Sequence, residues 1–349
     1  MKSAQQYIST AFLLLALSTN GWSQKVGTSS MQFLKVMPTA RATAMGEAYS
    51  TLGLGADAVF WNPAGLVDSK GLELASTMTL WLFDTRQTAV AAAVPIGDDY
   101  GTIGVQLQYV DYGSIQETRV DQLMFVGATG SQVYNPGLTG RTFSPYAYVV
   151  GISYANRFTD KFATGITVKY VNESLYGSSS VSVVNPSDGT TQQYNTFANV
   201  LLFDFGMHYN TGYRSIMIGV AIQNFGSQVK FADEGFPAPL SFRLGTSADL
   251  LGSNALVVDD ETNRLTFAYD IFQPNDYAQQ MHFGLEYCFN TMLFLRTGYK
   301  VNYDSEKMTY GGGLATDFEG YRLTFDYSFA GMGDYLNNVH RISLGIVLK

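Results

Sequence analysis

Residues 321–329 read YRLTFDYSF and residues 339–348 read VHRISLGIVL, so both stretches alternate between apolar and polar side chains. Successive side chains of a β-strand point to opposite faces of the sheet. The two stretches are separated by a short break that contains glycine, and they predict a hairpin with one apolar wall and one polar wall. A soluble β-sandwich would also bury an apolar wall, so this hairpin alone fits either a sandwich or a barrel that faces lipid.

The same alternation recurs along most of the chain, in fourteen segments that we predict to be strands. Many such strands, behind the export signal described below, are typical of a transmembrane β-barrel. We therefore predict an all-β fold, a transmembrane antiparallel β-barrel of about fourteen strands within residues 69–349. The predicted strands are residues 71–82, 85–96, 101–112, 143–157, 161–171, 199–209, 215–223, 239–250, 264–272, 280–290, 292–301, 309–317, 321–330 and 339–348.

The lengths of the connections support a barrel. Bacterial barrels have short turns at the periplasmic end and longer loops outside. If the first strand runs outward, the two longest connections, residues 113–142 and 172–198, both fall on the outer side. Two connections break the rule, because the outer turn at Phe83-Asp84 is short and the inner connection 252–263 is long.

The composition agrees with a wall that meets lipid. Charged residues make up 14% of the chain, against about 25% in ordinary soluble domains. No stretch after the first twenty residues reaches the roughly 18 apolar residues of a membrane helix. The formal net charge is −8, which argues against nucleic acid and anionic lipid headgroups as electrostatic partners.

The N-terminus is typical of a signal peptide, which we place at residues 1–23. Lys2 supplies positive charge, residues 11–17 form an apolar core, and Gly21 and Ser23 suit cleavage after Ser23. No cysteine lies directly after this apolar core, so we do not expect a lipoprotein anchor. The predicted location is the bacterial outer membrane.

The segment 24–68 has neither the alternation of strands nor the polarity of a disordered tail. Its alanines and Met45 favour short helices, while Asn62-Pro63 and Ala64-Gly65 mark turns. Such a segment has to pack against something, and the inside of the barrel is the only large surface available. We therefore predict an N-terminal plug that lies within the barrel.

Three segments resemble the PorV/PorQ family of outer-membrane barrels from Bacteroidota, which share the fold of the FadL fatty-acid transporters. The first runs from Phe33 through Arg41 and Gly46 to the sequence WNPAGL at residues 61–66. The second is FPAPLSFRLG at residues 236–245, and the third is FDYSF at 325–329 followed by HRISLG at 340–345. The three segments lie in the expected order.

This resemblance implies a fourteen-stranded barrel with a plug, or hatch, inside it. It also implies a role in the type IX protein secretion system, as a component or as a related paralogue. The plug motif to which the resemblance points comprises Arg41, Met45, Gly46, Trp61, Asn62, Pro63, Ala64 and Gly65.

With the apolar faces outward, charged side chains of both signs point into the lumen. They would form either a polar conduit or a set of ion pairs that fastens the wall to the plug. We favour ion pairs, because charges away from water need partners and a charge-selective channel would show a bias in sign. Arg41, Glu47 and Asp57 of the plug would complete the set, and we expect Arg322→Ala and Arg341→Ala to lower heat stability. The predicted lumenal charge network is Arg243, Glu286, Arg296, Arg322, Asp326 and Arg341.

No catalytic motif is present, and we expect a protein that is not an enzyme. The three histidines, His208, His282 and His340, are isolated and lack the spacing of metal ligands. We therefore predict no catalytic, metal-binding or cofactor-binding residues and no cofactor.

Two functions fit these features. The main prediction is a non-enzymatic secretion component whose outer loops, residues 113–142 and 172–198, engage exported proteins and other secretion components. The alternative is a FadL-like passive transporter of hydrophobic small molecules with an apolar pocket beneath the outer loops. Residues 123–126, LMFV, could line such a pocket or contact a client. Both functions involve outer-membrane lipid, and neither involves nucleic acid.

Overall fold

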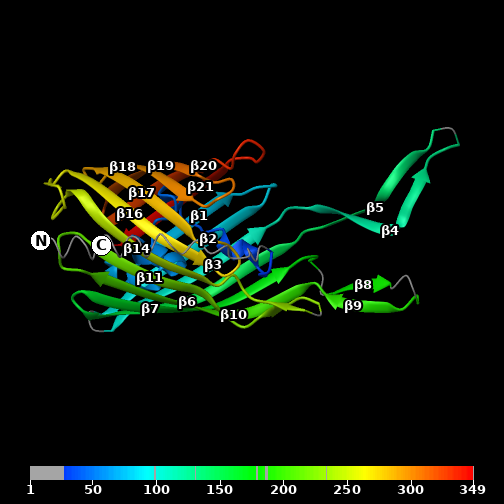
Figure 1. Cartoon of the computed structure of the whole chain (residues 1–349), viewed down its shortest axis with the longest axis horizontal. Coiled ribbons are helices and arrows are strands. Elements are labelled where there is room, and N and C mark those ends of the chain that lie inside the picture. The colour runs from blue at the N-terminus through cyan, green and yellow to red at the C-terminus, as the bar shows by residue number, and fades with distance from the viewer. Residues whose placement is uncertain are drawn as a thin grey trace, which may run out of the picture.

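The structure, a computed structural model, describes residues 27–97, 100–129, 131–177, 180–184, 188–232 and 234–348. The predicted signal peptide, residues 1–23, lies outside the described residues. Figure 1 shows a β-barrel with two hairpins that project beyond one end. We call this end the outer end and the opposite one the inner end.

Fourteen strands form a closed antiparallel barrel, which confirms the predicted fold class. All fourteen predicted strands are present. β1 and β21 close the ring, with pairs from Glu73↔Val347 to Leu80↔His340. The wall consists of β1 Glu73–Leu80, β2 Arg86–Gly97, β3 Gly101–Asp111, β6 Tyr146–Thr159, β7 Phe162–Ser174, β10 Phe197–Asn210, β11 Met217–Gly226, β14 Ser241–Gly252, β16 Asn263–Pro274, β17 Gln280–Phe289, β18 Leu293–Val301, β19 Met308–Phe318, β20 Tyr321–Ala330 and β21 Val339–Leu348.

The two faces of the wall follow the alternation in the sequence. In the last hairpin, Phe325 and Leu344 are 45% and 57% exposed on the outside of the barrel, whereas Ser328 and Arg341 are each 1% exposed on the inside. Apolar side chains are stable on the outside because lipid surrounds them there. The closed ring also leaves no unpaired strand edge in contact with lipid.

The two longest outer connections form hairpins that the sequence did not predict. β4 (Ile115–Val126) pairs with β5 (Val133–Phe143), and β8 (Ser180–Val184) pairs with β9 (Thr191–Asn195). Their alternation is weak, but antiparallel pairing satisfies the backbone groups of these long segments. The remaining short strands are β12 (Val229–Lys230), β13 (Gly235–Phe236) and β15 (Val258–Asp259).

The plug consists of five short helical pieces that precede the barrel. α2 contacts β18 to β21, whereas η3 contacts β3, β6, β7 and β10 on the far side, so the plug crosses the lumen. No helix in the described part of the chain is long and apolar enough to span a membrane. The helical pieces are η1 (Gln32–Lys35), α2 (Ala40–Ala44), η2 (Gly55–Asp57), α3 (Ala58–Trp61) and η3 (Pro63–Asp68).

Glycines in the wall let the plug backbone approach the strands closely. Gly284 and Gly298 face each other across β17 and β18, and Gly165 and Gly206 do so across β7 and β10. A Cβ atom at Gly298 would lie 1.9 Å from the backbone nitrogen of Gly46. At Gly165 a Cβ atom would lie 2.4 Å from the plug backbone. The wall therefore needs glycine where the main chain of the plug touches it.

Gly298→Ala is expected to displace the plug from β18, because the added methyl group collides with backbone. The cost should be about 1–3 kcal/mol, seen as a lower unfolding temperature of the folded band in a heat-modifiability gel. Gly312→Ala is the control, because the nearest atom to a Cβ there lies 3.5 Å away. Equal unfolding temperatures for the two variants would contradict the close approach at Gly298.

Candidate functional site

The plug separates two cavities in the lumen, an outer one of about 750 Å³ and an inner one of about 310 Å³. Glu47 lines the outer cavity and Thr51 the inner one, so the chain between them forms part of the partition. The turn at Tyr49 and Ser50, within this stretch, is held in place by Asp270 of the barrel wall. The backbone N–H groups of Tyr49 and Ser50 donate to the Asp270 carboxylate at 3.1 and 2.9 Å.

The outer cavity lies beneath the outer connections and is lined mainly by apolar surface. The N-terminal part of the plug supplies one side of it, and the outer ends of several strands supply the rest. Its apolar lining includes Phe33, Leu34, Val36, Met37, Trp81, Leu82, Val110, Phe272 and Met332.

Four of the seven charged side chains that line the outer cavity are paired with one another. Lys300 Nζ lies 2.7 Å from Glu47 Oε1 and 2.9 Å from Glu306 Oε1. Arg243 Nη2 lies 3.3 Å from Glu47 Oε2, and its guanidinium carbon is 4.1 Å from the ring centroid of Phe272. Two cations thus face two carboxylates, and we call these four residues the outer charge cluster.

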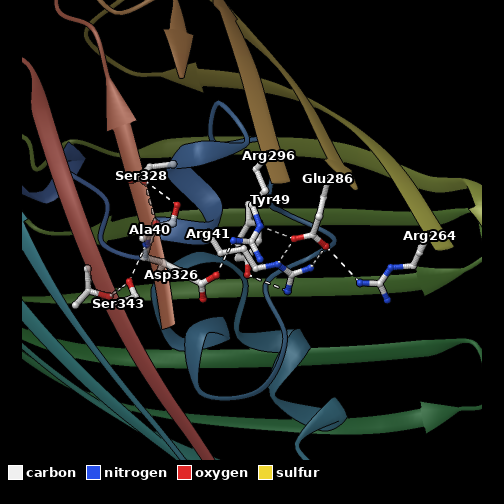
Figure 2. Close-up of polar contacts among 12 residues, drawn as sticks. Ala40, Arg41, Tyr49, Arg264, Glu286, Arg296, Asp326, Ser328 and Ser343 are labelled. Atoms are coloured by element: carbon white, nitrogen blue, oxygen red, sulfur yellow. Dashed lines mark hydrogen bonds and ion pairs between the residues drawn. The ribbon is translucent and has the colours of Figure 1, made fainter. Parts of the chain in front are cut away.

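A second group of charges fastens α2 to β17 (Figure 2). Arg41 makes a bidentate contact with Glu286, with Nε to Oε2 at 2.8 Å and Nη2 to Oε1 at 2.9 Å. Arg296 lies 2.6 Å from the same Glu286 and 2.5 Å from Asp326, and Arg264 lies 3.3 Å from Glu286. The Glu286 side chain is fully buried. We call these five residues the inner charge cluster.

The structure brings together three residues of the predicted network, Glu286, Arg296 and Asp326, in the inner charge cluster. Arg243 belongs to the outer charge cluster instead. Arg341 points into the lumen and is 1% exposed, with its guanidinium carbon 5.4 Å from the Trp81 ring centroid. Its Nε and Nη1 atoms have no hydrogen-bond partner among the described residues.

The predicted place of Arg322 in this network is wrong. Arg322 lies at the inner rim, where Nη1 is 3.4 Å from Asp317 and Nη2 donates to the Thr291 carbonyl at 2.5 Å. Arg322 lies two residues after the inner turn at Glu319-Gly320, so its side chain meets solvent rather than the plug. The direction of alternation predicts the face of a residue but not its height in the barrel.

Residues Met45, Gly46 and Trp61 of the predicted plug motif are packed in the lumen. Trp61 is fully buried, and its ring meets Tyr49 edge to face with centroids 5.4 Å apart. Met45 is fully buried beside Gly46, which has a left-handed φ of 63°. A Cβ atom at Gly46 would lie 2.9 Å from the Tyr299 backbone nitrogen, so both conformation and space require glycine.

The turn at residues 62–65 shapes the last part of the plug. Asn62 Oδ1 accepts a hydrogen bond from the Ala64 N–H at 3.2 Å, and Pro63 opens η3, where its fixed φ suits a helix start. Asn62 Nδ2 donates to the Ser50 carbonyl at 2.8 Å. A Cβ atom at Gly65 would lie 1.9 Å from the Gly53 carbonyl oxygen. This motif therefore fixes the shape of the plug and supplies no reactive group.

Sequence reasoning missed Lys300, Glu306 and Arg264. Lys300 faces inward like Arg296, four residues earlier on β18, so the alternation could have identified it. Glu306 lies in the connection between β18 and β19, where no periodic pattern exists. Arg264 lies near the inner end of β16, and only the three-dimensional path of the plug brings it near Arg41.

The start of the plug is tied to the outer connection between β16 and β17. Asp276 forms an ion pair with Lys35 and accepts hydrogen bonds from Gln32 at 2.8 Å and Ser29 at 2.5 Å. Burial alone would raise the pKa of Asp276, but these hydrogen bonds and the Lys35 charge outweigh it and hold the pKa below its ordinary value. The tether is thus strongest when Asp276 is ionised.

Comparisons with known proteins support the fold alone. No family model and no curated protein matches this chain. The toluene transporter TodX of Pseudomonas putida is similar with a TM-score of 0.54 and 15% identity, covering 87% of this chain and 96% of that one. The toluene transporter TbuX of Ralstonia pickettii gives a TM-score of 0.52 and 14% identity, covering 88% and 96%. The chain therefore has the fold of these transporters.

The residues that the structure describes contain no group of three or more His, Cys, Asp or Glu side chains placed to hold a metal ion. The arrangement offers two cavities, a packed partition and two clusters of paired charges. Both cavities are of a size that binds small molecules.

Glu286→Gln is expected to destabilise the plugged barrel, because it leaves buried guanidinium groups without their shared counter-charge. Breaking a buried ion pair costs about 3–5 kcal/mol, so the unfolding temperature in a heat-modifiability gel should fall clearly. Arg322→Ala, at the solvent-exposed rim, should leave it almost unchanged. A larger fall for Arg322→Ala than for Glu286→Gln would contradict the assignment of the inner charge cluster.

Acid is expected to release the start of the plug. A carboxyl whose pKa is lowered in the folded state stabilises it above the ordinary pKa of about 3.9, and this contribution disappears as the pH falls through the folded pKa. A spin label at Ser30→Cys, in a Cys288→Ser background, should become mobile at low pH. With Asp276→Asn the label should be mobile already at pH 7, and an immobile label there would contradict the tether.

Proposed function

We propose that this protein is a passive transporter of small hydrophobic molecules across the bacterial outer membrane. The observation that carries the proposal is the mainly apolar outer cavity of about 750 Å³ beneath the outer connections, with a plug below it. Cavities of this size and polarity are usual for the binding of small molecules. The fold shared with TodX and TbuX, which are toluene transporters, supports the same choice.

The balanced outer charge cluster favours a neutral or weakly polar solute in the outer cavity. Lys300 and Arg243 are occupied by Glu47 and Glu306, so neither cation is free to attract an anion strongly. An apolar solute would instead replace water against Trp81, Val110 and Phe272, which is favourable in proportion to the apolar area buried. No reaction is required of the protein, in keeping with a non-enzymatic role.

Transport requires that part of the plug moves, so that the outer and inner cavities become connected. The turn at Tyr49 and Ser50 is held by Asp270, and His208 Nε2 donates to the Ser50 carbonyl at 2.8 Å. These are hydrogen bonds to one short stretch of chain, whereas α2 and η3 are packed on glycine-lined wall. A local shift of this turn would therefore join the cavities at a lower cost than expulsion of the whole plug.

Cells of a Gram-negative host that produce the full chain are expected to take up radiolabelled toluene faster than cells without it. Val110→Trp, on the inner face of β3, should fill part of the outer cavity and cut this gain severalfold. Val105→Trp lies on the same strand but faces lipid, where Val105 is 45% exposed, and should keep the full rate. Folded protein in the membrane with no gain in uptake would overturn the proposal.

The predicted secretion role, with its PorV/PorQ resemblance, is the second candidate. One observation favours it: residues 123–126 do not line the outer cavity but are exposed on the β4–β5 hairpin, with Phe125 65% exposed. Exposed apolar clusters of this kind suit contact with another protein. In the source organism, removal of residues 120–136 should then impair surface attachment of exported proteins while toluene uptake persists.

A further inference from the structure

One side of the outer cavity carries a single carboxylate, that of Glu173 near the outer end of β7. Glu173 lies opposite Ala147 of β6 and Ala198 of β10, and both alanines are buried. Val110 of β3, which also lines the cavity, lies opposite Ala147. Residues that lie directly opposite each other share one face of a sheet. The carboxylate therefore interrupts a row of small apolar side chains on the inner face of the wall.

The next row of the wall toward the inner end is apolar as well. Val171 of β7 lies opposite Val149 of β6 and Val200 of β10, and all three are buried. Leu34 of the plug packs with them in one apolar cluster and lines the cavity. Glu173 is thus a charged group with apolar side chains beside it and below it.

Glu173 has one hydrogen-bond partner among the described residues. The Tyr112 hydroxyl donates to Oε1 at 3.0 Å, whereas Oε2 has no partner there and is accessible rather than sealed in the wall. Glu173 is 8% exposed and lines the outer cavity, so the carboxylate meets the cavity space. A charge that leaves water is costly unless other groups pair with it or donate to it. Glu173 therefore lacks a donor on its cavity side.

The cations that line the outer cavity do not supply this donor, because each is paired with another carboxylate. Lys35 pairs with Asp276, and Arg243 and Lys300 belong to the outer charge cluster. No ion pair in the described part of the chain includes Glu173. A solute bound in the cavity is the remaining source of a donor.

We propose that the outer cavity binds small phenols, which join an apolar ring to one hydroxyl group. The hydroxyl group donates to Glu173 Oε2, and the ring lies against Val110 and Leu34. Hydrogen bonds to an ionised acceptor are short and about twice as strong as neutral ones. A hydroxyl group also leaves water at a lower cost than an ammonium group, which suits a mainly apolar lining. This proposal rests on the proposed function, because it names the solute class of the same cavity.

The probe is p-cresol, whose hydroxyl group is that of a tyrosine side chain, with a pKa of about 10, and is neutral at pH 7. Its analogue 4-methylanisole carries a methyl group on the same oxygen, so it keeps the ring but cannot donate. Binding of each radiolabelled compound to the full chain in lipid nanodiscs is measured by equilibrium dialysis. Empty nanodiscs correct for partition into lipid. We expect p-cresol to bind more tightly, although 4-methylanisole is the more apolar compound.

Glu173→Leu is expected to lower the affinity ratio of p-cresol to 4-methylanisole by about tenfold, as the loss of one charged hydrogen bond predicts. Glu173→Gln should lower the ratio by less, because its amide oxygen still accepts. Glu117→Gln is the matched control and should keep the ratio. Glu117 also accepts from a tyrosine hydroxyl, that of Tyr176 at 2.6 Å, but it lies on the β4–β5 hairpin and does not line the cavity.

Heat-modifiability gels establish that each variant is folded, and the graded pair at Glu173 guards against one that is not. An unchanged ratio in Glu173→Leu would overturn the proposal, since the hydroxyl group would then not contact Glu173. Tighter binding of benzylamine than of p-cresol would overturn it as well, because the site would then select cations.

Toluene uptake by cells is a separate measurement. Uptake without a preference for p-cresol over 4-methylanisole would overturn the phenol site and leave the transport proposal standing. The expected preference without uptake would overturn the transport proposal and leave the phenol site standing.

Discussion

The buried carboxylate of Glu286 is the interaction on which the rest of the lumen depends. It holds Arg41 of the plug and Arg296 of the wall at 2.8 and 2.6 Å, and through Arg296 it reaches Asp326 on β20. Removing Glu286 would deprive the Arg296 guanidinium, whose side chain is 2% exposed, of one of its two counter-charges in a place with little water. The plug is therefore fixed to β17 and β18, and every other feature of the lumen is arranged around α2 in that position.

Glycine makes this attachment possible. Ion pairs of this length require α2 to lie directly on the strands, and the facing glycines of β17 and β18 remove the side chains that would keep it away. The short ion pairs and the close packing thus both depend on the short distance between α2 and the strands β17 and β18. On the opposite wall, Gly165 and Gly206 do the same for the turn at residues 62–65.

Strict alternation was sufficient to predict the fourteen strands and their inward and outward faces. Alternation failed to predict the surroundings of a side chain where these depend on its position along the barrel axis. Arg322 has the inward direction but lies at the rim, whereas Lys300, with the same direction, lies deep in the outer charge cluster. The hairpins β4–β5 and β8–β9 were missed because their stability comes from pairing rather than from a buried face. The cavities could not be predicted at all, since they depend on the path of the plug.

The two cavities differ in the charges that line them. Arg243 and Lys300 are matched by Glu47 and Glu306 in the outer cavity, so burial of apolar area dominates binding there. The lining of the inner cavity contains four cations and two carboxylates, so the sign of a solute's charge matters more there. If solutes pass through both cavities, as proposed, apolar area would govern their binding in the outer cavity, and the sign of their charge would matter in the inner one.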